Sequence, residues 1–343
     1  MSLESEIAQQ PDVCARILDE GPTEARALAP RLAKASHLTF VARGTSDHAA
    51  TYGKYLFESI AGIVSASAAP SIVTQYGAPP RYEGGAAIGI SQSGSSPDVA
   101  AVVAAARRSG AFTIAITNAA RSRLARTAEA TFALRCGPER AVAATKTYTA
   151  SCVVLALLAS STGAVSGASP IVFDGLVDAM REAVSSAREA SRIARRIGSR
   201  RMLVVLGRGY DYAAALEGAL KIKELARVWA EPYSSADFAH GPRTLLERDT
   251  PVLLFASRGV MLREARRTAA WLAERGAKVY AVTNDEGLAE RCDDAVVIRT
   301  ACSEAVAPIA LSVVAQHLAR AVAIRHGRDP ERPVGISKVT RTL

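Results

Sequence analysis

A hydroxyl-rich stretch, Ser91-Gln-Ser-Gly-Ser-Ser-Pro, offers the clearest chemistry in this sequence. It follows an apolar run at residues 86–90, typical of a buried parallel strand, and precedes a helical pattern at residues 99–109. Pro97 suits the first turn of that helix, where its missing N–H costs nothing. A strand, a polar loop and a helix N-terminus with free N–H groups form a site for an anion, above all a phosphate. The alternative is a Ser-rich turn that binds nothing.

The same loop lacks the lysine of a Walker loop and the G-x-G-x-x-G fingerprint of dinucleotide sites. Hydroxyl groups in place of a lysine favour a small phosphorylated metabolite over a nucleotide.

Four charged residues in the second half are candidates for acid–base or nucleophilic chemistry. Lys221 and Glu224 stand three positions apart on one face of a predicted helix, although such a pair is more often a surface salt bridge. His240 precedes Gly-Pro in a loop, which suits a general acid or base. Lys338 lies in an extended tail. It is either a charged residue of a disordered terminus, the usual case, or a lysine that covers a site and acts there as a nucleophile or a cation.

The elements that must position these residues alternate between strand and helix, which predicts parallel sheets covered on both faces. Two N-terminal helices end near Leu32, with a restart at Gly21-Pro22, and one amphipathic helix is expected over residues 172–197. The segment at residues 202–211 resembles residues 38–46, and two later segments repeat at the same offset of about 165 residues. The sequence therefore predicts two tandem three-layer α/β domains of flavodoxin-like or Rossmann-like type, at residues 33–165 and 199–326.

The second copy has Ser257-Arg-Gly-Val where the first has the hydroxyl cluster, so one phosphate site per chain is expected. Residues 1–32 form the N-terminal helices, residues 166–198 the linker helix, and residues 327–343 the tail in this interpretation.

Composition limits the other possibilities. The net charge of +9 raises nucleic acid as a partner, but basic residues are dispersed among acidic ones and aromatic residues are sparse, so none is expected. The five scattered cysteines form no C-x-x-C, which indicates reduced thiols in a cytoplasmic protein. No apolar run reaches the length of a membrane span and no secretory signal is recognised, so no membrane partner is expected.

These motifs, in this order along the chain, resemble the tandem sugar isomerase (SIS) domain family, and in particular the isomerase half of glucosamine-6-phosphate synthase. The resemblance rests on Gly44-Thr-Ser, Ser91-Gln-Ser-Gly, Ala143-Ala-Thr-Lys, the helix with Lys221 and Glu224, His240-Gly-Pro and the Lys338 tail. By position it implies that phosphate and sugar are held by Gly44, Thr45, Ser46, Ser91, Gln92, Ser93, Ser96, Ala143 and Ala144.

The resemblance also implies a division of catalytic roles. Glu224 would move a proton between C1 and C2, and Lys221 would support Glu224 or the enolamine oxygen. His240 would open the sugar ring, reaching the site from the neighbouring subunit of a homodimer. Lys338 would contact the open-chain carbonyl. The resemblance implies no metal and no other cofactor.

Three departures bear on the reaction. Val334 stands where the synthase has an arginine, Ala144 replaces a serine, and Ser95 replaces an acidic residue. The sequence also holds no counterpart to the synthase's glutaminase domain, and its tail resembles the stand-alone deaminases more closely.

We therefore expect an isomerising deaminase that converts glucosamine 6-phosphate and water to fructose 6-phosphate and ammonia. Galactosamine 6-phosphate is the second choice of substrate. A fructosamine-6-phosphate deglycase and a non-catalytic phosphosugar sensor are the alternatives.

Overall fold

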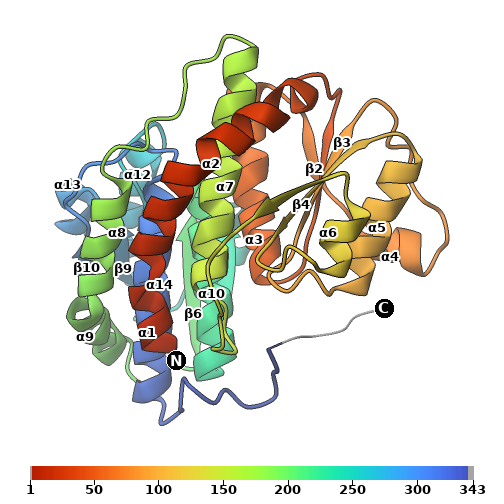
Figure 1. Cartoon of the computed structure of the whole chain (residues 1–343). Helices are drawn as coiled ribbons and strands as arrows, with labels where there is room; N and C mark the ends of the chain where they lie inside the picture. The colour runs from red at the N-terminus through yellow and green to blue at the C-terminus, as the bar shows by residue number, and fades with distance from the viewer. Residues whose placement is uncertain (1, 339–343) are drawn as a thin grey trace. The chain divides into compact units, whose positions relative to one another are not determined.

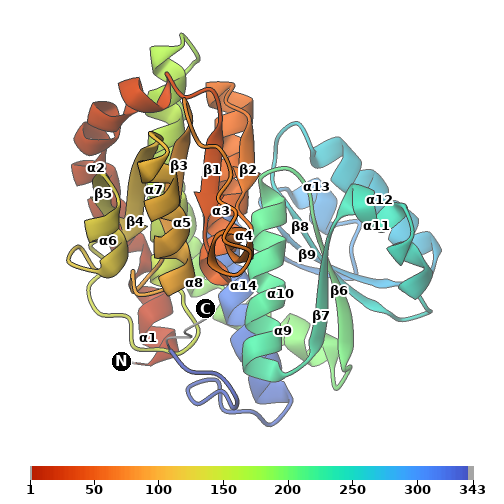
Figure 2. The same cartoon turned by 90° about the vertical axis from the view of Figure 1, so that its right-hand side faces the viewer.

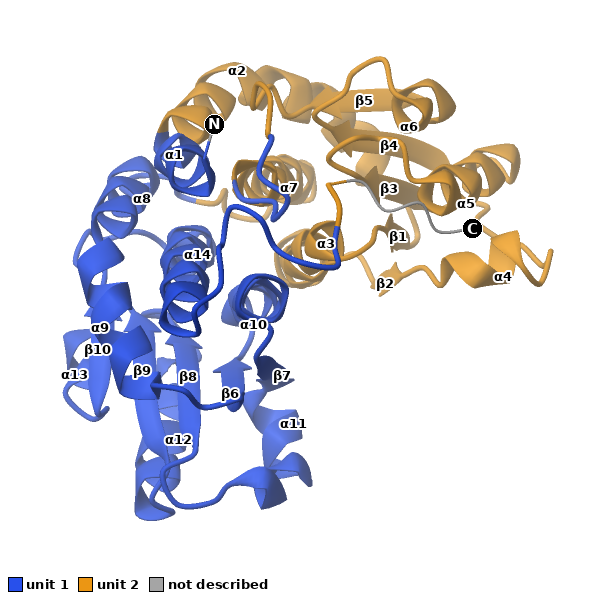
Figure 3. Cartoon of the chain, turned by 90° about the horizontal axis from the view of Figure 1, so that it is seen from below, with its two compact units in different colours: residues 1–11, 140–145, 172–336 blue, residues 12–139, 146–171, 337–343 orange. Residues whose placement is uncertain are grey.

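The computed structural model describes residues 2–338 and contains two parallel sheets of five strands each (Figure 1). The chain divides into two compact units, and each unit holds one sheet. Unit 1 comprises residues 1–11, 140–145 and 172–336, and unit 2 comprises residues 12–139, 146–171 and 337–343 (Figure 3). The α/β fold class that the sequence predicts is confirmed.

Unit 2 contains the first sheet. Its strands are β1 (Leu38–Val41), β2 (Ser65–Ser67), β3 (Ala86–Ile90), β4 (Phe112–Thr117) and β5 (Ala130–Ala133). They follow the order β2-β1-β3-β4-β5, so the direction of winding reverses between β1 and β3. In sheets of this kind the reversal leaves a crevice outside the carboxyl ends of the two strands, where ligands bind.

Helices cover both faces of this sheet. They are α2 (Gln10–Leu32), α3 (Thr45–Leu56), α4 (Pro70–Thr74), α5 (Pro97–Arg108), α6 (Arg123–Thr127) and α7 (Lys146–Val165), with a π-helical turn at Phe57–Ala61. Helices α3 and α7 lie on one face, and α5 and α6 lie on the other (Figure 3). This double cover buries β3 and β4 along their whole length, as expected for apolar parallel strands.

Unit 1 contains the second sheet. Its strands are β6 (Met202–Gly207), β7 (Trp229–Ser234), β8 (Pro251–Ala256), β9 (Lys278–Thr283) and β10 (Asp294–Val297). Its order is β10-β9-β8-β6-β7. Read from β7, this order matches that of the first sheet strand for strand, with β6 in the place of β1 and β7 in the place of β2, which confirms the predicted duplication.

The helices of unit 1 include the start of the chain. They are α1 (Leu3–Ala8), α8 (Leu176–Ser185), α9 (Ala187–Ile197), α10 (Asp211–Ala226), α11 (Ser235–Ala239), α12 (Leu262–Glu274), α13 (Glu286–Ala289) and α14 (Ala307–Arg325), with a 3₁₀ turn at Pro242–Leu245. Helix α10 packs along β6 and β7 (Figure 2).

Two helices differ from the sequence predictions. The single helix expected over residues 172–197 is broken at Ser186 into α8 and α9. Helix α2 continues through Gly21 and Pro22 instead of restarting there. A Cβ at Gly21 would lie 3.0 Å from the Leu157 side chain and 3.2 Å from that of Phe132, so glycine lets α2 pack closely on its neighbours.

Two helices, α7 and α14, are long and apolar enough to cross a membrane, contrary to the expectation from the sequence. In each helix, 83% of the 18-residue apolar segment is buried inside the structure, as in a helix of the protein core.

Candidate active site

The hydroxyl-rich loop of unit 2 joins β3 to α5. Strands β1 and β3 are paired in parallel, with Val41 opposite Gly89, so their carboxyl ends lie side by side. The loop after β3 therefore lies beside the loop after β1, at the point where the strand order reverses. The structure brings together at this edge the predicted phosphate ligands Gly44, Thr45, Ser46, Ser91, Gln92, Ser93 and Ser96.

Several hydrogen-bond donors in this loop are open. The backbone N–H groups of Gln92, Ser93 and Ser96 have no partner in the part of the chain that the structure describes. The Ser96 hydroxyl does not cap α5, and it lies 3.5 Å from the Ser91 hydroxyl. Helix α5 has 12 residues, and its N-terminus carries partial positive charge. Open N–H groups and hydroxyls at such a position form a cradle for a phosphate.

The shape of the loop depends on Gly94. Its φ is +59°, and a Cβ there would lie 2.0 Å from the Ser122 Oγ. A larger residue would have to displace Ser122, so glycine is required for this turn.

An ion pair joins the two loops. The Arg43 Nε, after β1, donates to the Asp98 Oδ2 in the first turn of α5 at 2.8 Å. Asp98 is 1% exposed, so the guanidinium offsets a buried negative charge that would otherwise oppose an anion in the cradle. Nothing in the local sequence indicated a role for Arg43. Its repeat counterpart Arg208 likewise pairs with a carboxylate, that of Glu264, at 2.9 Å.

Lys338 is also part of unit 2. Its Nζ lies 3.0 Å from the Glu139 Oε2. The Glu139 carboxylate is fully buried and also accepts hydrogen bonds from the N–H and hydroxyl of Thr147, at 3.1 and 2.8 Å. The tail lysine is therefore held by a specific carboxylate, which no local sequence pattern indicated.

In unit 1, helix α10 carries the predicted Lys221 and Glu224. The Lys221 Nζ lies 2.6 Å from the Glu224 Oε2 and 3.4 Å from the Glu217 Oε1. The Lys221 and Glu217 side chains are at most 1% exposed, whereas that of Glu224 is 23% exposed. Burial alone would lower the pKa of Lys221, but the two carboxylates outweigh it and raise the pKa.

This arrangement excludes the interpretation of Lys221 and Glu224 as a surface salt bridge. The lysine keeps its charge in the interior, and Glu224 is the end of the group that a ligand can reach. Glu217, one helical turn before Lys221, was missed, although its spacing of four residues was available in the sequence.

The remaining predicted residues of unit 1 lie in loops. His240 is exposed at the end of α11, and its ring makes no hydrogen bond to any residue that the structure describes. Ala143 is 2% exposed and Ala144 is half-buried, in the segment at residues 140–145. The buried Glu6 carboxylate holds this segment by accepting from the N–H groups of Arg140 and Ala141, at 2.6 and 3.3 Å.

The second copy of the cradle is filled by the chain's own carboxylates. Asp211 accepts from the Ser257 N–H at 2.8 Å and from its hydroxyl at 2.9 Å. Glu304 accepts from the Val260 N–H at 2.9 Å, and a Cβ at Gly259 would lie 2.0 Å from the Glu304 Cδ. Residues 257–260 are the repeat counterparts of Ser91–Gly94 in the hydroxyl-rich loop. Because Asp211 and Glu304 occupy their donors, the second copy offers no open cradle there.

Asp211 makes this region sensitive to pH. Burial is the main cause that raises the pKa of Asp211 to about 7; the Glu304 charge adds to it and the Ser257 hydrogen bonds oppose it. The unfolded chain releases this proton near pH 4, so from pH 4 to 7 the folded state binds more protons than the unfolded state. The free energy of unfolding should therefore fall as pH rises through this window, by at most about 1.4 kcal/mol per pH unit from this group.

Asp211→Asn should remove that contribution. Urea unfolding of the wild type and the variant at pH 5, 6, 7 and 8 measures the difference, with the exposed Asp237→Asn as control. Parallel pH profiles for wild type and D211N would contradict the assignment.

The chain resembles known proteins in both sequence and fold. The family model described as SIS domain matches the chain twice, at residues 31–161 and 197–325. The glutamine–fructose-6-phosphate aminotransferase (isomerizing) of Pyrococcus horikoshii is 32% identical over 344 residues, covering 97% of this chain and 56% of that protein. The chain thus spans about half the length of the curated relatives it matches.

Two solved structures share the architecture. The C-terminal domain of glucosamine-fructose-6-phosphate aminotransferase from Francisella tularensis superposes with a TM-score of 0.86 at 25% identity, covering 96% of this chain and 98% of that one. Glucosamine-6-phosphate deaminase from Thermotoga maritima gives a TM-score of 0.80 at 24% identity over 100% of both chains, which shows a shared fold alone. Since the two matched segments make up most of the sequence and correspond to the two sheets, the chain belongs to the SIS domain family and contains two copies of the domain.

Proposed function

We propose that this protein is a sugar-phosphate isomerase that deaminates an amino-sugar 6-phosphate, with glucosamine 6-phosphate as the first choice. The observation that carries the proposal is the Glu217–Lys221–Glu224 group, which leaves a single carboxylate, that of Glu224, accessible beside a buried ammonium. A proton shift between adjacent carbons needs a positioned carboxylate and a nearby cation. The open cradle of unit 2 supports recognition of the 6-phosphate.

The proposed reaction begins with ring opening by His240. Glu224 then removes the proton from C2 of the open-chain aldehyde, which gives an enolamine, and returns a proton to C1. The resulting C2 imine is attacked by water, and its C–N bond breaks to leave fructose 6-phosphate and ammonia. Lys221 keeps Glu224 oriented through their ion pair, and Lys338 would leave Glu139 to contact the carbonyl oxygen.

A coupled assay for ammonia and fructose 6-phosphate tests the reaction. Glucosamine 6-phosphate should yield the two products in equal amounts, with no requirement for glutamine. Galactosamine 6-phosphate and a fructosamine 6-phosphate are assayed in parallel. Turnover of galactosamine 6-phosphate alone would make it the substrate, and turnover of the fructosamine 6-phosphate alone would identify the deglycase reaction. Tight binding of these compounds without any product would contradict an enzymatic role and favour a sensor.

The proposal includes a homodimer in which His240 serves the partner's site. Its exposed ring, which makes no hydrogen bond or ion pair with a described residue of its own chain, is available for that role. Co-expressed Glu224→Gln and His240→Ala chains should then regain about a quarter of wild-type activity, because half of the dimers are mixed and each holds one intact site. Each variant alone should be inactive. If the mixture stays inactive while mixed dimers are detected, His240 acts within its own chain.

A further inference from the structure

The segment at residues 140–145 belongs to unit 1, although the chain on either side of it belongs to unit 2 (Figure 3). It includes Ala143 and Ala144, which the family resemblance implies hold the sugar. Residues 140–144 lie in no helix or strand, and their only hydrogen bonds within the described chain are the two to the Glu6 carboxylate. Apart from packing, the position of the segment therefore depends on Glu6.

Glu6 lies on α1 and has an uncommon environment for a carboxylate. The residue is 0% exposed, and it has no ion pair with any residue that the structure describes. Its two hydrogen bonds come from the consecutive N–H groups of Arg140 and Ala141, at 2.6 and 3.3 Å. Burial of a carboxylate without a cation costs free energy, so the overall stability of unit 1 does not account for a glutamate at this position.

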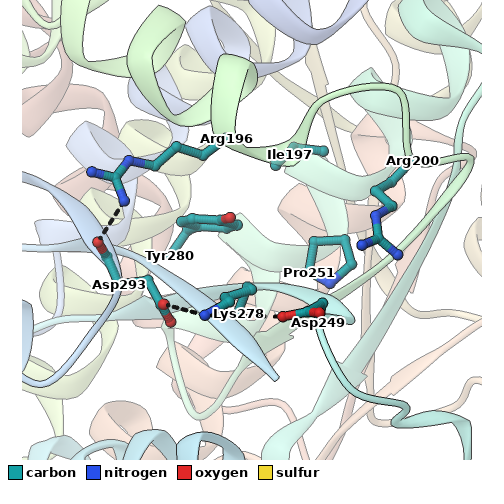
Figure 4. A pocket seen from close by; sticks show the side chains of 8 residues that line it. All are labelled: Arg196, Ile197, Arg200, Asp249, Pro251, Lys278, Tyr280 and Asp293. Atoms are coloured by element: carbon teal, nitrogen blue, oxygen red, sulfur yellow. Dashed lines mark hydrogen bonds and ion pairs between the residues drawn. The ribbon is translucent and has the colours of Figure 1, made fainter. Parts of the chain in front are cut away.

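Acidic groups elsewhere in unit 1 are paired with cations. In a hollow of about 310 Å³ beside β8 and β9, the Lys278 Nζ lies 3.2 Å from the Asp293 carboxylate and 4.0 Å from that of Asp249 (Figure 4). Next to them, Arg196 pairs with the Asp294 carboxylate at 2.9 Å. These pairs balance charge at the surface, whereas the carboxylate of α1 holds two backbone groups of one irregular segment.

The chain on both sides of Glu6 is fixed to α14. The side-chain amides of Gln10 and Gln316, each at most 1% exposed, exchange hydrogen bonds of 2.7 and 3.2 Å. The Glu4 carboxylate accepts from the Arg320 guanidinium at 2.7 Å. Helix α1 is therefore a rigid support for the carboxylate that holds the segment.

Helix α14 packs in turn against α10, which carries the proposed base Glu224. A continuous set of contacts inside unit 1 thus joins residues 140–145 to that base. We propose that Glu6 is a positioning residue that fixes the sugar-holding segment relative to Glu224. The inference rests on the proposed function, because it takes Ala143 and Ala144 to hold the sugar.

Glu6→Gln tests the proposal. It replaces one of the two acceptor oxygens with a donor, so one N–H group of the segment loses its partner. We expect the affinity for fructose 6-phosphate, measured by calorimetry, to fall about tenfold, while the affinity for inorganic phosphate, which carries no sugar, stays unchanged. Turnover of glucosamine 6-phosphate should fall about 10²-fold, because a shift of about 1 Å in the sugar has an effect of this size.

The matched control is Glu182→Gln. Glu182, on α8, likewise accepts from two consecutive N–H groups, those of Arg299 and Thr300, at 2.8 and 2.9 Å. These two residues belong to a loop of unit 1 that holds no proposed site residue, so E182Q should leave both affinities and the turnover unchanged. Urea unfolding of E6Q and E182Q shows whether a loss of affinity follows a loss of stability.

Equal affinities of E6Q and wild type for fructose 6-phosphate, or an equal loss for inorganic phosphate, would overturn the proposal. A wild type that binds fructose 6-phosphate no more tightly than inorganic phosphate would also overturn it, because the segment then holds no sugar. If E6Q does not fold, Glu6→Asp, which keeps the charge but is one methylene shorter, is tested in the same way. A wild type without turnover would refute the proposed reaction, whereas the two affinities would still test Glu6.

Discussion

Glu224→Gln should lower the turnover of glucosamine 6-phosphate by about 10²–10⁴-fold, the usual contribution of a general base. The amide keeps the size of the side chain and a contact to Lys221, but it cannot accept the C2 proton. Binding of the sugar phosphate should change little, since the proposed phosphate cradle belongs to unit 2. Steady-state kinetics gives the loss of turnover, and NMR in D₂O shows whether the C2 proton still exchanges with solvent.

The matched control is Glu274→Gln, an exposed glutamate of α12 that has no ion pair within the described chain. E274Q should behave as the wild type. Full turnover or undiminished C2 exchange in E224Q would refute the role of Glu224 as the base. A loss of sugar-phosphate binding equal to the loss of turnover would make Glu224 a binding residue instead.

Lys221→Met should destabilise unit 1 by about 3–5 kcal/mol at pH 7, because it leaves the buried Glu217 carboxylate without its ammonium partner. The Glu217 side chain is 0% exposed, so water cannot replace the lost charge. Urea unfolding measures the change. Adding Glu217→Gln to K221M should recover part of the lost stability, since an amide tolerates burial better than a carboxylate.

Lys223→Met controls for the loss of a lysine from the same helix, because Lys223 is half-buried and has no ion pair among the described residues. K223M should change the free energy of unfolding by less than about 1 kcal/mol. Equal losses in K221M and K223M would show that the ion pairs of Lys221 contribute nothing specific.

Much of this architecture follows from local sequence. The apolar run before Ser91 and the proline after it predict β3 and α5 closely, because strand burial and helix initiation are local properties. β7 was not predicted, since Glu231 and Pro232 interrupt its apolar pattern; as an edge strand it needs fewer ladder hydrogen bonds. The break at Ser186 was also missed, because the apolar face continues from α8 into α9.

The contacts of the site are harder to predict where they join distant segments. Lys338 and Glu139 are 199 positions apart, and no local pattern connects them. Arg43 and Asp98 come together only because β1 and β3 are neighbours in the sheet. Lys221 and Glu224 were found because helical spacing is local, but their burial depends on the packing of α10 against other elements.

The two carboxylates in the second cradle have a further consequence. A diffusible anion occupies a site only in proportion to its concentration, whereas a carboxylate of the same chain is present at a fixed effective concentration and cannot be diluted away. Asp211 and Glu304 thus act as tethered ligands of the second copy. The second copy therefore keeps its internal ligands at any concentration of free anion, and the proposed phosphate site is confined to the corresponding loop of unit 2.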